Sequence, residues 1–153
     1  MKKKRGNPGA VQNKRARFDY ELKESFLAGL VLSGPEVRSV RMNHASLQGA
    51  FVNIHNGEAW LMNAQVMPVK TNAAHLPSEM QTRNRKLLLK KRELEELEVA
   101  KHQGFTIVPT KLLTKGRFIK LEIAIARGKK QYDKRQVIKK RDEERDVRRN
   151  FAN

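Results

Sequence analysis

Residues 117–126 read RFIKLEIAIA, and this stretch decides the fold class. Aliphatic side chains at positions 119, 121, 123 and 125 alternate with Lys120, Glu122 and Ala124. An alternation of period two is typical of a β-strand that turns one face to the core. The stretch therefore predicts a half-buried strand, and FTIVPTKLL at 105–113 is its hairpin partner across Thr114-Lys115-Gly116.

Strand patterns also occur earlier in the chain. FDYELKESFLAGLVL at 18–32 places apolar residues on one face, and only Glu24 interrupts that face. Asn56-Gly57 separates the two apolar-patterned runs AFVNIH and EAWLMNAQV, which is a strong short-range signal for a hairpin. Five or six antiparallel strands are expected.

Two segments favour helices. Pro35 and Glu36 suit the first turn of a short helix, because proline fits there and a carboxylate favours the helix N-terminus. KLLLKKRELEELEVAKHQG at 86–104 predicts a longer helix that Gly104 ends in the left-handed conformation. Residues 67–86, polar and with two prolines, predict a long loop.

These elements predict a mainly β fold. A small antiparallel OB-like β-barrel with two or three flanking helices would leave no exposed strand edge, and a sandwich is the alternative.

Charge divides the chain into three parts. The chain of 153 residues has 33 Lys+Arg and 16 Asp+Glu, a formal net charge of +17, and most of the excess lies at its two ends. We expect a basic N-terminal arm at 1–17, an OB-like RNA-binding barrel at 18–126 and a basic C-terminal tail at 127–153.

An excess of cations indicates a polyanionic partner, with nucleic acid first and an anionic membrane surface second. The chain contains no cysteine, its basic start has no apolar segment typical of a secretory signal, and no apolar run is long enough to span a membrane. We expect a soluble, cytoplasmic protein. The four histidines lack metal-ligand spacing and no catalytic motif occurs, so neither an enzyme nor a cofactor is expected.

The tail has too few apolar residues to offset its ordering entropy, so we expect it to be disordered when free. As a helix over 129–149 it would align a basic stripe of Lys130, Lys134, Arg141, Arg145 and Arg148. Such a stripe fits a phosphate-lined groove, and Tyr132 adds a ring that can stack on an unpaired base. A solvated tail that only aids solubility is the alternative.

TRNRKLLLKKR at 82–92 is the second basic segment. It predicts either phosphate contacts, with Lys86 among them, or simply a helix start with charged flanks; the local excess of cations favours phosphate contacts.

Four blocks of sequence, in order along the chain, resemble the SsrA-binding protein family, also called small protein B. They are NKRARFDYEL (13–22), AGLVLSGPEVRSVR (28–41), RKLLLKKREL (85–94) and ARGKKQYDKRQVIKKRDEER (126–145). The resemblance covers almost all of residues 13–149 and implies an oval antiparallel barrel related to the OB-fold.

The resemblance also implies a function in ribosome rescue, or trans-translation. Members of the family bind the tRNA-like part of transfer-messenger RNA and deliver it, with elongation factor Tu, to stalled ribosomes. The RNA, charged with alanine by alanyl-tRNA synthetase, supplies a reading frame for a degradation tag. The tail enters the empty mRNA channel beside the decoding centre and folds there as a helix.

The resemblance further implies site residues. RNA-binding positions are Arg15, Arg17, Tyr20, Leu88 and Lys120, to which the basic segment above adds Lys86. Ribosome-binding tail positions are Gly128, Lys129, Lys130, Tyr132, Asp133, Lys134, Arg135, Lys139, Lys140 and Arg141.

Two features depart from the family pattern. Leu27 stands where many relatives have an acid, and RMNHASLQGAF at 41–51 differs from the usual turn. Two other functions stay open: a ribosomal or other structural RNA-binding protein, and a small nuclease, for which the sequence lacks converging carboxylates or histidines.

Overall fold

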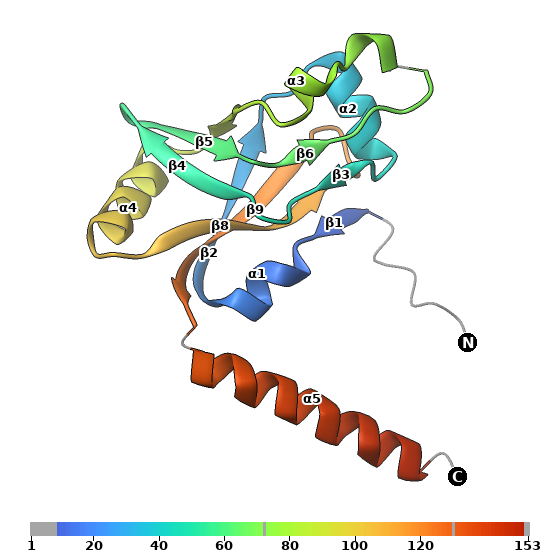
Figure 1. Cartoon of the computed structure of the whole chain (residues 1–153). Coiled ribbons are helices and arrows are strands. Elements are labelled where there is room, and N and C mark those ends of the chain that lie inside the picture. Colours follow the sequence, from blue (N-terminus) through green and yellow to red (C-terminus); the bar gives the residue numbers. More distant parts are fainter. Residues whose placement is uncertain (1–8, 72, 130, 152–153) are drawn as a thin grey trace.

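The computed structural model describes residues 9–71, 73–129 and 131–151, and their main feature is one antiparallel sheet (Figure 1). Its strands are β1 (Ala10–Gln12), β2 (Tyr20–Leu30), β4 (Phe51–His55), β5 (Glu58–Met62), β7 (Arg85–Leu88), β8 (Thr106–Leu113) and β9 (Lys120–Gly128). Their order is β1-β8-β4-β5-β7-β2-β9, and β8 also pairs with β9. The short strands β3 (Ala45–Ser46) and β6 (Gln65–Val66) form a separate pair. The prediction of a mainly β fold is confirmed.

Several helices flank the sheet. They are α1 (Lys14–Asp19), α2 (Gly34–Arg41), α3 (Ser78–Gln81), α4 (Lys91–His102) and α5 (Gln131–Phe151), with a 3-10 turn at Ala73–His75. In Figure 1, α4 lies at the end of the β4–β5 hairpin, α2 and α3 lie toward the opposite end, and α5 lies beyond α1. The segment predicted as a long loop at 67–86 therefore contains α3, the 3-10 turn and the start of β7.

The long pair β2–β9 forms one wall of the core. Phe26 lies opposite Ile123 and Ala28 opposite Leu121, and all four side chains are buried in the main cluster. The pairing register shifts between Leu22 and Ser25. A bulge of this kind adds an unpaired residue to one strand, which explains why the apolar face is interrupted at position 24.

Residues 123–126 of β9 are buried on both faces, so the prediction of a half-buried strand is wrong there. Ile123 to Ala126 are all buried. Ala126 belongs to a second cluster with Ala16 and Val108, against which Tyr20 and Leu22 pack. The cause is α1, which covers the outer face of β8 and β9 at this point.

The segment before β2 is folded over residues 10–19. Ala10 to Gln12 pair with Leu113 to Lys111 of β8. Asn13 caps α1 by accepting a hydrogen bond from the backbone N–H of Ala16 at 3.2 Å. Phe18, predicted as a strand residue, lies in α1 instead, and β2 begins at Tyr20.

The predicted turns are confirmed. Asn56 and Gly57 have φ of 51° and 72°, the left-handed pair that a two-residue hairpin requires. Gly104 has φ of 91° after α4. Pro35 lies in the first turn of α2, where Ser33 and Glu36 form a capping box.

The predicted start of the longer helix is wrong. Residues 85–88 form β7, and α4 begins at Lys91. Leu87 is buried between its partners Ala59 of β5 and Leu30 of β2, whereas Lys86 and Leu88 point outward. A run of three leucines fits either a helix or a strand. Here the strand forms, because it places Leu87 in the core.

A buried ion-pair cluster ties α2 to β7. Glu36 accepts hydrogen bonds from the guanidinium groups of Arg83 and Arg85, and Arg85 also donates to the carbonyl of Ala64 at 2.8 Å. Burial raises the pKa of Glu36, but the hydrogen bonds from Arg83, Arg85 and the Ser33 N–H outweigh burial and leave this pKa below its ordinary value.

Candidate nucleic-acid interface

Five of the six residues predicted to bind RNA form two groups, one at each end of β2, and Lys86 lies apart from both. Arg15, Arg17 and Tyr20 lie at its start. Leu88 and Lys120 lie near its end, where each is paired with Gly29. Tyr20 and Gly29 are roughly 30 Å apart at the usual rise per strand residue. Both groups face away from the main core.

The first group is carried by α1. Arg15 is exposed and forms an ion pair with Asp19 at 3.1 Å, one helical turn away. Arg17 is exposed, and Tyr20 is half-buried against the second cluster. The short helix is held in place by Asn13, whose side-chain amide donates to the carbonyls of Leu47 and Pro109 at 3.1 and 2.9 Å.

The C-terminal helix docks on this group through cations. Lys129 donates from its backbone N–H to the Asp19 carbonyl at 2.9 Å and from Nζ to the Arg17 carbonyl at 3.0 Å. Lys134 pairs with the Asp19 carboxylate at 3.3 Å. Burial raises the pKa of Asp19, but its bonds to Lys134 and Arg15 lower this pKa by more.

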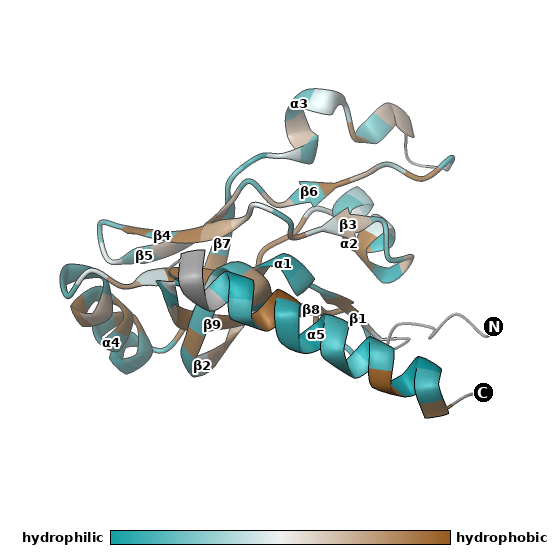
Figure 2. Cartoon of the chain, turned by 60° about the horizontal axis from the view of Figure 1, so that its bottom comes forward, coloured by the Kyte–Doolittle hydropathy of each residue, from teal (hydrophilic) through white to brown (hydrophobic). Residues whose placement is uncertain are grey.

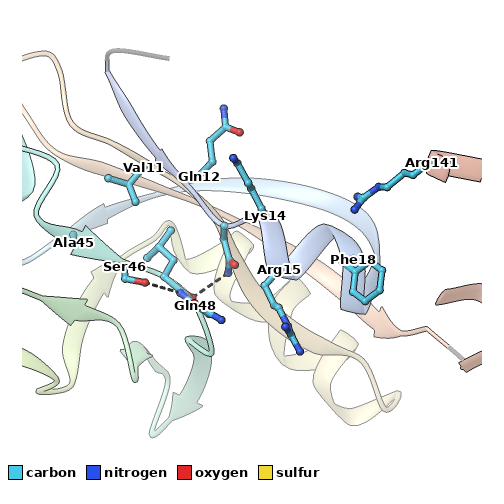
Figure 3. Close-up of a pocket in the computed structure, with 11 residues that line it drawn as sticks. Val11, Gln12, Lys14, Arg15, Phe18, Ala45, Ser46, Gln48 and Arg141 are labelled. Atoms are coloured by element: carbon cyan, nitrogen blue, oxygen red, sulfur yellow. Dashed lines mark hydrogen bonds between the residues drawn. The ribbon is translucent and has the colours of Figure 1, made fainter. Parts of the chain in front are cut away.

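Arg141 makes the second contact, seven residues along α5. Its guanidinium lies 5.8 Å from the centroid of the Phe18 ring, and Figure 3 shows it reaching toward that ring. Residues 134 and 141 share one face of a helix. The face predicted to meet phosphate therefore meets α1 in this structure.

A cavity of about 550 Å³ opens beside these contacts, between β1, α1, β3 and α5 (Figure 3). Lys14, Arg15 and Arg141 line it together with the side-chain amides of Gln12 and Gln48. Amides and cations are donors that suit phosphate and sugar oxygens.

The second group is a row across three strands. Gly29 of β2 lies opposite Leu88 of β7 and opposite Lys120 of β9. Leu88 is 56% exposed, and Lys120 is exposed beside it. The strand pairing thus brings together two predicted contacts that are 32 positions apart in the chain.

Lys86 lies on the same outer surface but is separate from that row. Its Nζ pairs with the Glu58 carboxylate at 3.0 Å, and both side chains are about half exposed. An RNA phosphate at Lys86 would have to compete with Glu58.

The remaining tail positions follow the helix. Gly128 ends β9, and Arg135, Lys139 and Lys140 are exposed on α5. Figure 2 shows α5 as a mostly hydrophilic rod. Lys130 lies outside the described residues, and so do the side chains of Tyr132 and Asp133.

Leu27 lies on the outer face of β2, directly opposite Glu122 of β9. Leu27 is 47% exposed, and Glu122 is partly exposed. The acid that many relatives have at position 27 is absent, but the neighbouring strand places the Glu122 carboxylate directly opposite this position.

Across the described ranges, no cluster of three or more His, Asp or Glu side chains is placed to hold a metal ion. Nor is any described helix both long and apolar enough to cross a membrane.

Sequence reasoning missed three contributors: Asn13, which caps α1; Asp19, which pairs with Arg15 and Lys134; and Arg41, whose guanidinium donates to carbonyls of the β8–β9 loop. Asn13 carried a usable signal, since asparagine is a preferred helix cap before KRARFD. Arg41 carried none, because its partners are carbonyls of a loop more than 70 positions away.

Known proteins resemble the chain over most of its length. A family model described as "SmpB protein" matches residues 10–153. An SsrA-binding protein from Oleidesulfovibrio alaskensis is 47% identical over 152 residues, covering 97% of each chain, and one from Gloeobacter violaceus is 45% identical over 140 residues, covering 91% of each. A solved structure described as "tmRNA-SmpB: a journey to the center of the bacterial ribosome" is 36% identical, with a TM-score of 0.66 over 80% of this chain and 86% of that one.

Proposed function

Because the chain belongs to the SmpB protein family, we propose that it binds the tRNA-like part of transfer-messenger RNA and delivers this RNA to stalled ribosomes. In this reaction the RNA supplies a short reading frame for a degradation tag. The two similar SsrA-binding proteins and the tmRNA-SmpB structure support this function at the level of the family.

One observation about this chain carries the proposal. Exposed cations lie at both ends of β2 on the outer surface, with Arg15 and Arg17 at one end and Lys120 at the other. A folded RNA of tRNA size can contact both ends at once, and each neutralised phosphate releases counterions.

We propose that the sheet is an OB-like barrel. The pairings run from β8 through β4, β5, β7, β2 and β9 and return to β8, which supports this assignment over an open sandwich. In this proposal the N-terminal arm ends at residue 17, the barrel spans 18–126 and the tail begins at 127, with β1 and α1 packed on the barrel.

The proposed RNA contacts are Arg15, Arg17, Tyr20, Lys86, Leu88 and Lys120. Cations at these positions would hold phosphates, and Tyr20 and Leu88 would pack against ribose or base.

We propose that the tail, disordered when free, enters the empty mRNA channel of the ribosome near the decoding centre and is helical there. The proposed contacts are Gly128, Lys129, Lys130, Tyr132, Asp133, Lys134, Arg135, Lys139, Lys140 and Arg141. The exposure of the described side chains of α5 supports a segment that separates easily from the rest of the chain.

The protein would act as a binding protein in the cytoplasm, without a catalytic site or cofactor of its own. Its indirect partners would be elongation factor Tu and alanyl-tRNA synthetase, which act on the same RNA.

The test is gentle purification of the protein followed by sequencing of the RNA that accompanies it. One dominant species with a tRNA-like end is expected. Recovery of ribosomal RNA in equal amounts from translating and stalled ribosomes would instead identify a ribosomal or structural RNA-binding protein. RNA cleavage that persists through purification would identify a nuclease.

A further inference from the structure

A groove with an apolar floor runs between α4 and the middle of β2. Its volume is about 420 Å³, and its floor includes Ala100 and Ile125, which are 6% and 8% exposed. Val99 of α4 also lines it and is 56% exposed. None of the six residues predicted to bind RNA belongs to its described lining, so the groove is a separate feature of the surface.

The bulge in β2 supplies one wall of this groove. The pairing register with β9 shifts between Leu22 and Ser25, and Glu24 lies within that gap. On a regular strand Glu24 would share the inward face of Leu22 and Phe26, but a bulge turns a side chain to a new direction. Glu24 is exposed and lines the groove. The one charged residue that interrupts the apolar face of β2 is therefore placed at a surface site.

One flank of α4 supplies the other wall. Glu95, Val99 and Gln103 are spaced four positions apart, so their side chains follow one side of the helix, and all three line the groove. Leu97, on the inward side, has no exposed surface and belongs to the main core. Because this buried leucine fixes the rotation of α4, the wall is in place before any ligand arrives.

The groove is acidic although the chain is strongly basic. Its described lining includes the three carboxylates of Glu24, Glu95 and Glu96 and the single cation of Arg92, on a chain with a formal net charge of +17. Arg92 pairs with Glu96 at 3.6 Å. Among the residues that the structure describes, Glu24 and Glu95 form no ion pair, so two carboxylates on different elements are left to a ligand. These charges repel RNA phosphates and attract a cationic partner.

We propose that this groove binds a lysine- or arginine-rich segment of a ribosomal protein. The aliphatic stems of such side chains would lie on Val99, Ala100 and Ile125, and their charged ends would reach Glu24 and Glu95. The choice of the ribosome rests on the proposed function. Ile125 lies two residues before the start of the tail at 127, so a tail in the mRNA channel brings the groove to the ribosome surface. That surface offers RNA and protein, and the acidic walls select protein.

The first test uses hexa-arginine as the probe and follows the backbone amide resonances of the full chain. We expect shifts at residues 95–103 and an affinity that falls as salt rises. The double variant Glu24→Gln/Glu95→Gln is expected to bind roughly 3- to 30-fold more weakly, because two charge pairs are lost. Val99→Arg places a cation in the groove and is expected to abolish binding. All three positions are exposed, and unfolding curves would check that the variants fold.

Glu79→Gln/Glu143→Gln is the matched control. It removes the same charge from two exposed carboxylates of α3 and α5, outside the groove. It is expected to bind hexa-arginine as the parent does.

The second test places the photoreactive residue benzoylphenylalanine at position 103 and irradiates the full chain on stalled ribosomes. We expect a crosslink to a lysine- or arginine-rich segment of a ribosomal protein, identified by mass spectrometry. Crosslinks to ribosomal RNA alone, or none, would overturn the proposed partner.

Equal hexa-arginine affinity of Glu24→Gln/Glu95→Gln and the parent, or no binding by the parent, would overturn the groove and leave the proposed function intact. Failure of the parent to bind the tRNA-like RNA would overturn the proposed function and the choice of the ribosome, even where the peptide binds. Self-association of the chain that Glu24→Gln/Glu95→Gln abolishes would assign the groove to the basic tail of a second copy instead.

Discussion

β9, which pairs with β2, and α5 follow one another in the chain but differ in how they are held in the structure. β9 buries Leu121, Ile123, Ala124 and Ala126 completely, whereas almost every described side chain of α5 is exposed. The pair is held by a shared core. The contacts that tie α5 to α1 include the Lys134–Asp19 ion pair and the Arg141–Phe18 cation–ring contact, and Lys129, just before α5, donates two hydrogen bonds to carbonyls of α1. Exposed ion pairs contribute little to stability, so the two segments differ in how readily they detach.

Truncation after Arg127 tests this contrast with the largest functional effect. We expect tagging of stalled nascent chains to be abolished while affinity for the isolated RNA changes little, because Lys120 and Leu88 remain on the sheet. Tagging is measured in a reconstituted translation system and affinity by filter binding. Loss of RNA binding in the truncated chain would show that the tail is needed for RNA binding as well as for tagging.

Glu36→Gln tests the buried cluster of the body. It leaves the fully buried Arg85 without its charged partner, and we expect a loss of about 3–5 kcal/mol in the free energy of unfolding at pH 7. The folded-state pKa of Glu36 is lowered, so its contribution is present above the unfolded-state pKa and is lost as pH falls through the folded-state pKa.

The free energies of unfolding of Glu36→Gln and the parent should therefore converge as the pH falls from about 5 toward 3, measured by urea titration. Parallel curves over that range would mean that the Glu36 charge is not the source of the difference.

Leu121→Ala in the core and Val147→Ala in the tail compare two truncations of aliphatic side chains. Leu121 has no exposed surface, and its truncation is expected to cost about 3 kcal/mol by thermal or chemical unfolding. The companion Val147→Ala removes a side chain of α5 that is 51% exposed, and we expect a change within about 0.5 kcal/mol. A similar cost at both positions would contradict the contrast.

Lys120→Ala sharpens the division of RNA contacts. We expect a several-fold weaker affinity for the tRNA-like RNA and a salt slope lower by about one unit, since one phosphate contact is lost. Lys139→Ala, an exposed cation of α5, is the control and should leave binding of the isolated RNA unchanged. Equal effects of the two substitutions would show that the tail also binds the tRNA-like RNA directly.

Asp19→Asn has the smallest expected effect. It weakens the contact of Lys134 with α1 and should change the free energy of unfolding by less than about 1 kcal/mol. Backbone order parameters of α5 should nevertheless fall, because its ion pair with α1 is gone. Unchanged order parameters would show that Lys129 and Arg141 suffice to hold the helix.

Much of the fold could be predicted from local pattern. Period two identified β2, the β4–β5 hairpin, β8 and β9, and Asn56-Gly57 identified its turn, because these signals depend on neighbours in the chain. The prediction of a helix at 86–89 was wrong, since three leucines fit either a helix or a strand until a partner is known. Leu87 became a strand residue because β5 and β2 flank it.

The candidate site was predicted in part. The family resemblance implied Lys120 and Leu88 separately, and only strand pairing placed them on either side of Gly29.

By itself the sequence determined that the chain has a β core and cationic ends, because side-chain alternation and net charge are properties of the chain alone. Only the tertiary structure decided that α1 covers the outer face of β9 and that Lys134 and Arg141 face α1. Those outcomes depend on which distant surfaces meet, and burial and ion pairing are determined by that meeting rather than by local sequence.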